Sequence, residues 1–246
     1  MCTLSFVPTE NGYCAAMNRD EHLERETALP PRLLRGGNLM AIYPQEASGG
    51  TWIASNECGI TLALLNWNLP LRGMDRRRSR GCLIPQLIVN RDSVDLEEAL
   101  NSLRLDGLPP FRLVGIIPRE QELREWQWNT TCLEQTSFSW HARHWFSSGL
   151  SDQLAGQYRG EACQRAWEDT GAGSLPWLRR LHQSHFSRQG PFSICVHRPE
   201  AGTVSYSEII HDHTRLTFGY SAGHPCENHP LLGLDMPLVH DDLVVL

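Results

Sequence analysis

The chain has 246 residues, of which 41% are hydrophobic and 20% charged, and its formal net charge is −6. This hydrophobic content supplies a core and excludes an intrinsically disordered chain, while the negative charge gives no electrostatic footprint for nucleic acid. All 22 basic residues are Arg and Lys is absent. The composition therefore excludes Schiff-base chemistry, the usual pyridoxal phosphate enzymes, phosphate-loop lysines and kinases.

Eight cysteines are scattered along the chain without a CxxC pair, which predicts neither a zinc ribbon nor a redox motif. The first residues lack a basic leader, and no apolar run is long enough to span a membrane, so we expect a cytoplasmic protein with reduced thiols. We interpret seven of the cysteines as inert, mostly buried thiols: Cys14, Cys58, Cys82, Cys132, Cys163, Cys195 and Cys226.

The first half of the chain predicts two β-hairpins. Apolar runs over residues 2–7 and 13–17 flank a turn, and runs over 51–55 and 60–67 flank a four-residue turn that ends in Gly59. The charged, Pro/Gly-rich stretch 18–37 between them predicts a surface loop.

The middle of the chain predicts a mixture of helices and strands. A dense Arg loop at 71–80 precedes helical periodicity over 83–105, with Asp92 or Ser93 as the N-cap. Residues 111–117 and 137–146 each predict a strand.

The second half predicts one or two helices over 153–188, interrupted around Gly171 to Gly173. Strands at 192–196, 203–210 and 216–220 follow. Strand pairs at both ends with helices between them favour an α+β layered fold in a single domain over residues 1–246.

Cys2 is the most informative candidate residue, because it starts a strand whose hairpin partner leads into Asn18-Arg19-Asp20-Glu21. If Met1 is removed, Cys2 presents a thiol and an α-amine with similar pKa values, and an N-terminal residue can serve as its own general base. We expect Arg19 to lower the thiol pKa and Asp20 to orient the amine. The alternative is an ordinary early cysteine beside a solvated charge run.

Several short motifs occur in the order seen in one family. They are Met1-Cys2, MNRDE at 17–21, GGTWIA at 49–54, GITLALLNW at 59–67 and SRG at 79–81. Over its first ~85 residues the chain resembles the NRDE family, which includes the transport and Golgi organisation protein two. This family is similar in its N-terminal half to cholylglycine hydrolases and penicillin V acylases, which are N-terminal nucleophile hydrolases.

The resemblance implies a four-layer αββα sandwich in which Cys2 is the nucleophile after loss of Met1. It implies that Arg19 and Asp20 flank the nucleophile and that Asn66 contributes to the oxyanion hole. The implied reaction is attack of the Cys2 thiolate on a non-peptide amide or acyl thioester, followed by hydrolysis of the acyl-enzyme. The implied partner is therefore a small acyl amide or thioester, without a cofactor. We expect further substrate contacts from Asn18, Trp67, Arg80 and Arg198.

The second half of the chain departs from the family pattern. Trp145-Phe146-Ser147-Ser148-Gly149-Leu150 replaces the usual Gly-Leu-Ser-Asn, and Val204 replaces the Arg of a Gly-Thr-Arg motif, with Arg198 nearby as a stand-in. These differences leave open a second hypothesis, that the fold is a non-enzymatic carrier of a lipid, acyl-CoA or haem. A third hypothesis is a structural scaffold.

Other clusters have ordinary interpretations. His211 and His213 could belong to a metal site, but their alternation favours a polar hairpin end, and we expect no metal. The eight Trp residues indicate core packing, or an apolar pocket for an acyl chain or haem. The Arg loop indicates a solvated face, or a site for an anionic group such as a coenzyme A phosphate: Arg72, Arg76, Arg77, Arg78 and Arg80.

Overall fold

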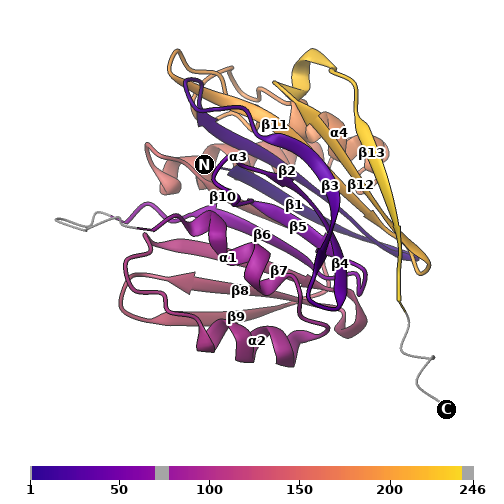
Figure 1. The fold of residues 1–246 in the computed structure, drawn as a ribbon. Helices are drawn as coiled ribbons and strands as arrows, with labels where there is room; N and C mark the ends of the chain where they lie inside the picture. Colours follow the sequence, from indigo (N-terminus) through magenta and orange to yellow (C-terminus); the bar gives the residue numbers. More distant parts are fainter. Residues whose placement is uncertain (1, 70–77, 240–246) are drawn as a thin grey trace.

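The computed structural model describes residues 2–69 and 78–239, and it contains two antiparallel β-sheets (Figure 1). In the first sheet, strand β1 is interior, with one neighbour on each side. In spatial order its six strands are β10 (Arg143–Ser147), β1 (Cys2–Thr9), β2 (Gly12–His22), β11 (Ala201–His211), β12 (Arg215–Ala222) and β13 (Leu232–Pro237).

The second sheet has seven strands that follow one another in both sequence and space. Every pair is antiparallel. Short connections of the hairpin kind join the neighbouring strands, except that residues 67–110, which include α1 and α2, connect β6 to β7. Its strands are β3 (Leu29–Gly36), β4 (Leu39–Gln45), β5 (Ile53–Asn56), β6 (Thr61–Asn66), β7 (Phe111–Ile117), β8 (Glu122–Trp128) and β9 (Leu133–Ser139).

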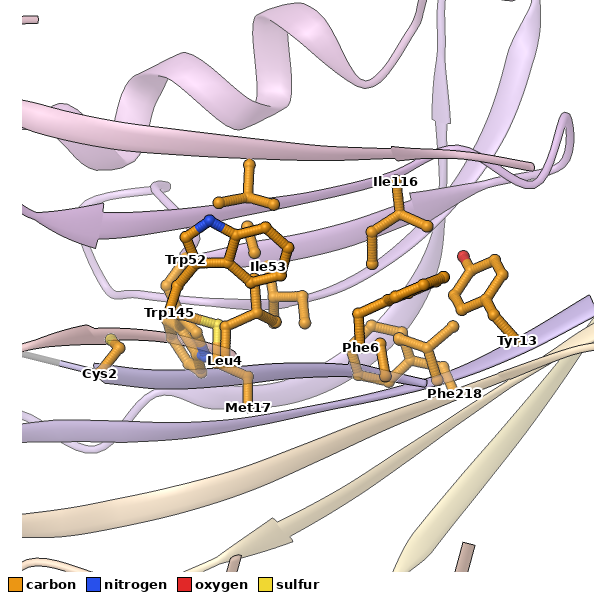
Figure 2. Close-up of a cluster of buried hydrophobic side chains, with 14 of the residues drawn as sticks. Cys2, Leu4, Phe6, Tyr13, Met17, Trp52, Ile53, Ile116, Trp145 and Phe218 are labelled. Carbon is orange, nitrogen blue, oxygen red and sulfur yellow. The ribbon is translucent and has the colours of Figure 1, made fainter. Parts of the chain in front are cut away.

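The two sheets pack face to face over a shared apolar core (Figure 2). Alternate residues of β1 and β2 point into this core, because side chains along a strand alternate between faces. Phe6 and Tyr13 lie toward one end of the cluster and Cys2 lies at the other, beside Trp52 and Trp145. The nucleophile candidate is therefore at the margin of the core.

Helices cover the outer face of each sheet. Helices α1 (Leu83–Leu87) and α2 (Ser93–Ser102) pack on the seven-stranded sheet, while α3 (Asp152–Ala166) and α4 (Leu175–Gln183) pack on the six-stranded one. The αββα prediction is confirmed. Asp92 caps α2 as expected, its side chain accepting from Asp95 N at 2.9 Å. Among the described residues, no helix has the length and apolar character needed to cross a membrane.

Three short 3₁₀ turns lie between these elements: η1 (Arg80–Cys82), η2 (Pro118–Glu120) and η3 (Pro225–Glu227). The first and last of them border the two sites described below.

The two predicted hairpins and the strand at 111–117 are confirmed, as is the helix pair broken near Gly171. The surface loop predicted at 18–37 is wrong. Strand β2 continues through the charged residues to His22 because β11 pairs with it along this whole length, with Ala201 opposite His22. Strand β3 occupies most of the remainder.

The single strand predicted over 137–146 is also wrong, because this stretch crosses between the sheets. Strand β9 ends at Ser139 in the seven-stranded sheet, and β10 begins at Arg143 in the other. The strand predicted at 192–196 is absent from the described chain, where these residues form turns. Periodicity alone cannot reveal a change of sheet.

Candidate active site

The backbone of Cys2 is fixed by both neighbouring strands. Cys2 lies opposite Arg19 of β2 and opposite Ser147 of β10. Its nitrogen donates to Ser147 Oγ at 3.0 Å, and the residue is 5% exposed. If Met1 is removed, this same nitrogen becomes the α-amine. Ser147 is therefore positioned to hold the group that would act as the general base.

Arg159 of α3 holds the other end of the Cys2 backbone. Its Nη1 donates to the Cys2 carbonyl oxygen at 3.2 Å and to Thr3 Oγ1 at 2.7 Å. Its Nη2 donates to Asp20 Oδ2 at 3.2 Å, in an ion pair whose side chains are 1% and 0% exposed. One buried guanidinium thus connects Cys2 and Asp20 through the face of the sheet that α3 covers.

Asp20 is itself fully buried. Its other carboxylate oxygen, Oδ1, accepts a hydrogen bond from Thr203 Oγ1 at 2.7 Å. Thr203 lies opposite Asp20 in the β2–β11 ladder. These contacts neutralise and orient the Asp20 carboxylate next to the backbone of Cys2.

Arg19 lies on the same face of the sheet as Cys2, within a network of charges. Its guanidinium lies 4.3 Å from the centroid of the Trp52 ring, and its Nη2 donates to Glu46 Oε1 at 2.6 Å. Glu21 and Arg25 complete the network, with Arg25 bonded to both carboxylates. Arg19 is thereby held in place by stacking and by ion pairing.

A cavity of about 310 Å³ opens beside Cys2. It brings together five of the predicted site residues, Cys2, Arg19, Asp20, Asn66 and Arg80. The remaining lining residues come from β2 and the loop that follows it, the 46–52 turn, β6 and the segment before α1: Glu21, His22, Arg25, Glu46, Thr51, Trp52, Leu64, Ser79 and Gly81. The cavity is thus rich in charged groups of both signs.

Two of the motifs quoted above meet in the wall of this cavity. Thr51 N donates to the carbonyl oxygen of Gly81 at 3.0 Å, and a Cβ on Gly50 would lie 2.9 Å from the Gly81 carbonyl carbon. Arg80 is anchored through Nη1 to the carbonyl oxygen of Pro110 at 2.7 Å. Gly50 and Gly81 therefore let the two backbone segments lie in close contact. A side chain at Gly50 would push them apart.

The environment of the Cys2 thiol has opposing effects on its pKa. Burial is the largest effect and raises the pKa, and the charge of Asp20 acts in the same direction. The charge of Arg19 and a backbone hydrogen bond from Asp20 lower it. The net result is a raised pKa, so Cys2 is a protonated thiol when no base is beside it.

Three other predicted residues lie outside the lining of this cavity. Asn18 is fully buried and donates through Nδ2 to the carbonyl oxygens of His182 and Ile194, both at 2.9 Å. Arg198 forms an ion pair with Glu200, and Trp67 follows β6. Asn18 therefore joins β2 to the layer formed by α4 and the segment that follows it.

The Arg loop is described only in part. Arg78 Nη1 donates to the carbonyl oxygens of Arg104 and Asp106, so its guanidinium is bound to the loop that follows α2. Three members of the loop lie outside the described residues: Arg72, Arg76 and Arg77.

His211 lies at the end of β11, where its ring stacks on Tyr13 with centroids 4.9 Å apart. The following turn is closed by Asp212, whose Oδ1 accepts from Arg215 N at 2.9 Å. The prediction of a polar hairpin end is confirmed.

Sequence reasoning missed Arg159 and Ser147. A signal for Arg159 was present, because it occupies the buried stripe of α3 together with Ala155, Ala162 and Cys163. A charged residue at such a position must have buried partners. Ser147 gave no signal, because its role depends on β10 crossing into the sheet of β1.

The fold defines the class: two antiparallel sheets lie between layers of helices in an αββα sandwich. The chain resembles penicillin V acylase from Agrobacterium tumefaciens, with 12% identity and a TM-score of 0.52, over 96% of this chain and 86% of that one. It also resembles the C2A mutant of conjugated bile acid hydrolase from Clostridium perfringens, with 11% identity and a TM-score of 0.55, over 96% and 92%.

The family model for Transport and Golgi organisation 2 matches residues 1–166, so the chain belongs to this family. A comparison with curated proteins gives no match.

Proposed function

We propose that the protein is a hydrolase of non-peptide amides or acyl thioesters, with Cys2 as an N-terminal nucleophile after removal of Met1. The observation that carries the proposal is the placement of Cys2 in the wall of a charged cavity, opposite Arg19. The fold shared with an acylase and a hydrolase supports the proposal.

The reaction begins with proton transfer from the Cys2 thiol to its own α-amine. This transfer matters because burial raises the pKa of the thiol, and a base on the same residue removes the proton without a second side chain. Ser147 Oγ, 3.0 Å from the nitrogen, orients the amine. Arg159 fixes the carbonyl group on the other side of the residue.

The thiolate sulfur then forms a bond to the carbonyl carbon of the substrate, and the carbonyl π-electrons move to oxygen. Asn66, at the end of β6 in the same cavity, supplies donors for the oxyanion. Collapse of this intermediate expels the amine or thiol, which takes the proton from the Cys2 ammonium. Water then forms a bond to the acyl carbon and gives a proton to the Cys2 amine. The carbon–sulfur bond breaks, the acid is released, and the amine returns the proton to the Cys2 sulfur.

The charged lining favours a substrate with an anionic group. Arg80 lines the cavity and is anchored through Nη1 to the Pro110 carbonyl oxygen. Arg19 and Arg25 are paired with Glu21 and Glu46. We assign Arg80 to the substrate anion by its place in the cavity wall, and Arg19, which lies opposite Cys2, to the thiolate. We also keep Trp67 and Arg198 as proposed contacts of a longer substrate, and the cytoplasm as the compartment in which the thiol stays reduced. The prediction that Asn18 contacts substrate is wrong, because Asn18 is fully buried and its amide nitrogen donates to two carbonyl oxygens of the protein.

The test is the intact mass of the full chain before and after brief treatment with iodoacetamide at neutral pH, with peptide mapping of the modified residue. The proposal expects loss of Met1 and labelling of Cys2 faster than labelling of exposed Cys132. Cys2→Ser should abolish hydrolysis of N-acyl amides and acyl thioesters, whereas the matched variant Cys132→Ser should retain it. Retained Met1, or full activity in Cys2→Ser, would overturn the proposal.

The alternative function is a carrier of a lipid, acyl-CoA or haem on the same fold. The raised pKa of Cys2 favours this alternative if Met1 stays in place, because the thiol then lacks a base. A carrier should bind such ligands equally well in the Cys2→Ser variant and should show no turnover. Ligand titration of both proteins therefore separates the two functions.

A further inference from the structure

Four side chains of the types that bind metal ions converge next to the start of β11, where His197 pairs with Gly202. They are His185, Cys195, His197 and Cys226, and one ligand atom from each lies within 4.8 Å of all the others. Cys226 is in η3, and the other three come from the irregular segment between α4 and β11. Residues up to 41 positions apart in the sequence, from His185 to Cys226, thus form one compact group.

The distances within this group fit a tetrahedral ion. His197 Nε2 lies 3.6 Å from Cys195 Sγ and 3.4 Å from Cys226 Sγ. Bonds of about 2.3 Å to sulfur and about 2.0–2.1 Å to nitrogen place tetrahedral ligands roughly 3.3–3.8 Å apart. Two thiolates and two imidazoles are also the donor set that zinc prefers.

A second observation points to a ligand at the same place. His185 Nε2 is buried and has no hydrogen-bond partner, and the His185 and His197 rings lie with centroids 4.9 Å apart. A buried polar atom without a partner costs free energy, and a metal bond removes that cost. The ring of His197 is held on another side by His224, with centroids 4.1 Å apart.

The surrounding backbone brings the ligands together without regular secondary structure. Cys195 N donates to the carbonyl oxygen of Ser184 at 3.0 Å, which places Cys195 beside His185. His197 N donates to the carbonyl oxygen of Gly190 at 3.3 Å. A segment that lacks helices and strands of its own gains stability from a cross-link that closes its loops.

This segment also contacts the candidate active site. Asn18 Nδ2 donates to the carbonyl oxygen of Ile194, and Val196 N donates to Thr203 Oγ1, which in turn donates to Asp20. The residues on either side of Cys195 are therefore hydrogen-bonded, directly or through Thr203, to two residues of the motif at 17–21. A metal at the cluster would therefore stabilise the position of the motif at 17–21 through these hydrogen bonds.

We propose that His185, Cys195, His197 and Cys226 form a structural Zn²⁺ site that cross-links the 184–197 segment to η3. On binding, each thiol releases its proton to solvent, so that two thiolates balance the charge of the cation. All four positions are protein ligands, which is the arrangement of a structural rather than a catalytic zinc. From the sequence alone Cys195 and Cys226 are expected to be inert thiols, because the cysteine spacing contains no CxxC pair.

The first test uses the full wild-type chain under reducing conditions. The native protein should contain about one zinc per chain by inductively coupled plasma mass spectrometry. After removal of zinc with a chelator, titration with Co²⁺ should give the intense ligand-field absorption of a tetrahedral site, together with a thiolate-to-cobalt charge-transfer band. A preparation without zinc that also gives no tetrahedral Co²⁺ spectrum would overturn the proposal.

Variants locate the site. Cys226→Ser and His197→Gln each remove a direct ligand and should weaken metal binding by more than about tenfold. Loss of a residue that only supports a ligand already weakens metal binding by about 10- to 100-fold. The matched control Cys132→Ser changes an exposed cysteine outside the cluster and should leave metal content unchanged. Full zinc retention in Cys226→Ser, or a native Cys195–Cys226 disulfide found by peptide mapping, would contradict the proposal. If a variant fails to fold, the Co²⁺ spectrum of the wild-type chain still tests whether a tetrahedral thiolate site exists.

Discussion

Asp20 and Arg159 form an ion pair that is buried on both sides, with Oδ2 and Nη2 3.2 Å apart. The same guanidinium donates to the carbonyl oxygen of Cys2. The pair therefore connects the helix layer formed by α3 to the first residue of β1. It links the stability of the six-stranded sheet to the geometry of the proposed nucleophile.

Replacing Arg159 with Met should destabilise the protein severely. The substitution keeps much of the side-chain volume but leaves the Asp20 carboxylate as an uncompensated buried charge. Loss of one partner from such a pair costs about 3–5 kcal/mol in the free energy of unfolding. Urea denaturation followed by circular dichroism measures this change.

The control for Arg159→Met is Arg215→Met, which breaks the ion pair with Asp212. Both side chains of that pair are exposed, by 63% and 41%, and exposed pairs contribute only about 0–1 kcal/mol. Equal losses of stability in the two variants would show that burial of the Arg159 pair has no energetic consequence.

Replacing Ser147 with Ala should slow reaction at Cys2 without unfolding the chain. It removes the acceptor for the Cys2 nitrogen, at 3.0 Å, and a hydrogen bond of this kind contributes roughly 0.5–1.5 kcal/mol. We expect the alkylation rate of Met1-free protein to fall by roughly 2- to 12-fold, with a shift of its pH profile. The pH profile is the readout that a purely structural serine would not change.

The matched control for Ser147→Ala is Ser102→Ala, at the end of α2 and outside the cavity lining. Its alkylation rate and pH profile should equal those of the wild type. A Ser147→Ala profile that coincides with both would assign Ser147 to packing alone.

The local signals in the sequence were sufficient for much of the fold. The hairpins of β1–β2 and β5–β6 were predictable because a turn with Gly connects two apolar runs. The four-layer αββα arrangement was predicted from the family resemblance, because the periodicity of apolar residues does not show how sheets and helices stack. Helix α2 was predictable from its cap, since Asp92 accepts from Asp95 N.

The parts that sequence did not reveal depend on long-range pairing. The charged residues of β2 are strand residues only because β11, about 180 residues later, pairs with them. Ser147 is close to Cys2 only because β10 joins the other sheet. The same reason hid the four-ligand cluster, since Cys226 approaches Cys195 through tertiary structure alone. The structure nevertheless brings five residues that the sequence pointed to into the lining of one cavity: Cys2, Arg19, Asp20, Asn66 and Arg80.

Replacing Gly50 with Ala should deform the cavity wall. The added Cβ would lie 2.9 Å from the carbonyl carbon of Gly81, and backbone cannot move aside as a flexible side chain can. Overpacking of this kind costs roughly 1–3 kcal/mol. Thermal unfolding would report the loss, and the alkylation rate of Cys2 would report the change in the cavity.

Gly233→Ala is the matched control, because nothing lies within 4 Å of the Cβ that it would add. This variant should keep wild-type stability within about 0.5 kcal/mol. A Gly50→Ala protein as stable as Gly233→Ala would show that the two backbone segments can separate at no cost.

Two buried histidines should make the protein less stable in mild acid. His144 Nδ1 and His182 Nε2 both contact Ser5 Oγ, at 2.8 and 2.9 Å. Burial lowers the pKa of His144 to about 4, and burial followed by the charge of His144 lowers that of His182 to about 3. Both rings are therefore neutral in the folded protein.

In the unfolded chain these histidines titrate near 6.5. Between pH 6.5 and 4 the unfolded state thus binds more protons than the folded state, so stability falls as the pH falls through this window. Each histidine should account for about 2 kcal/mol between pH 7 and 5. Urea unfolding at both pH values should show a smaller loss for His144→Gln than for the wild type. The exposed control His141→Gln should lose as much as the wild type, whereas a His144→Gln loss equal to the wild type would assign the acid sensitivity to other groups.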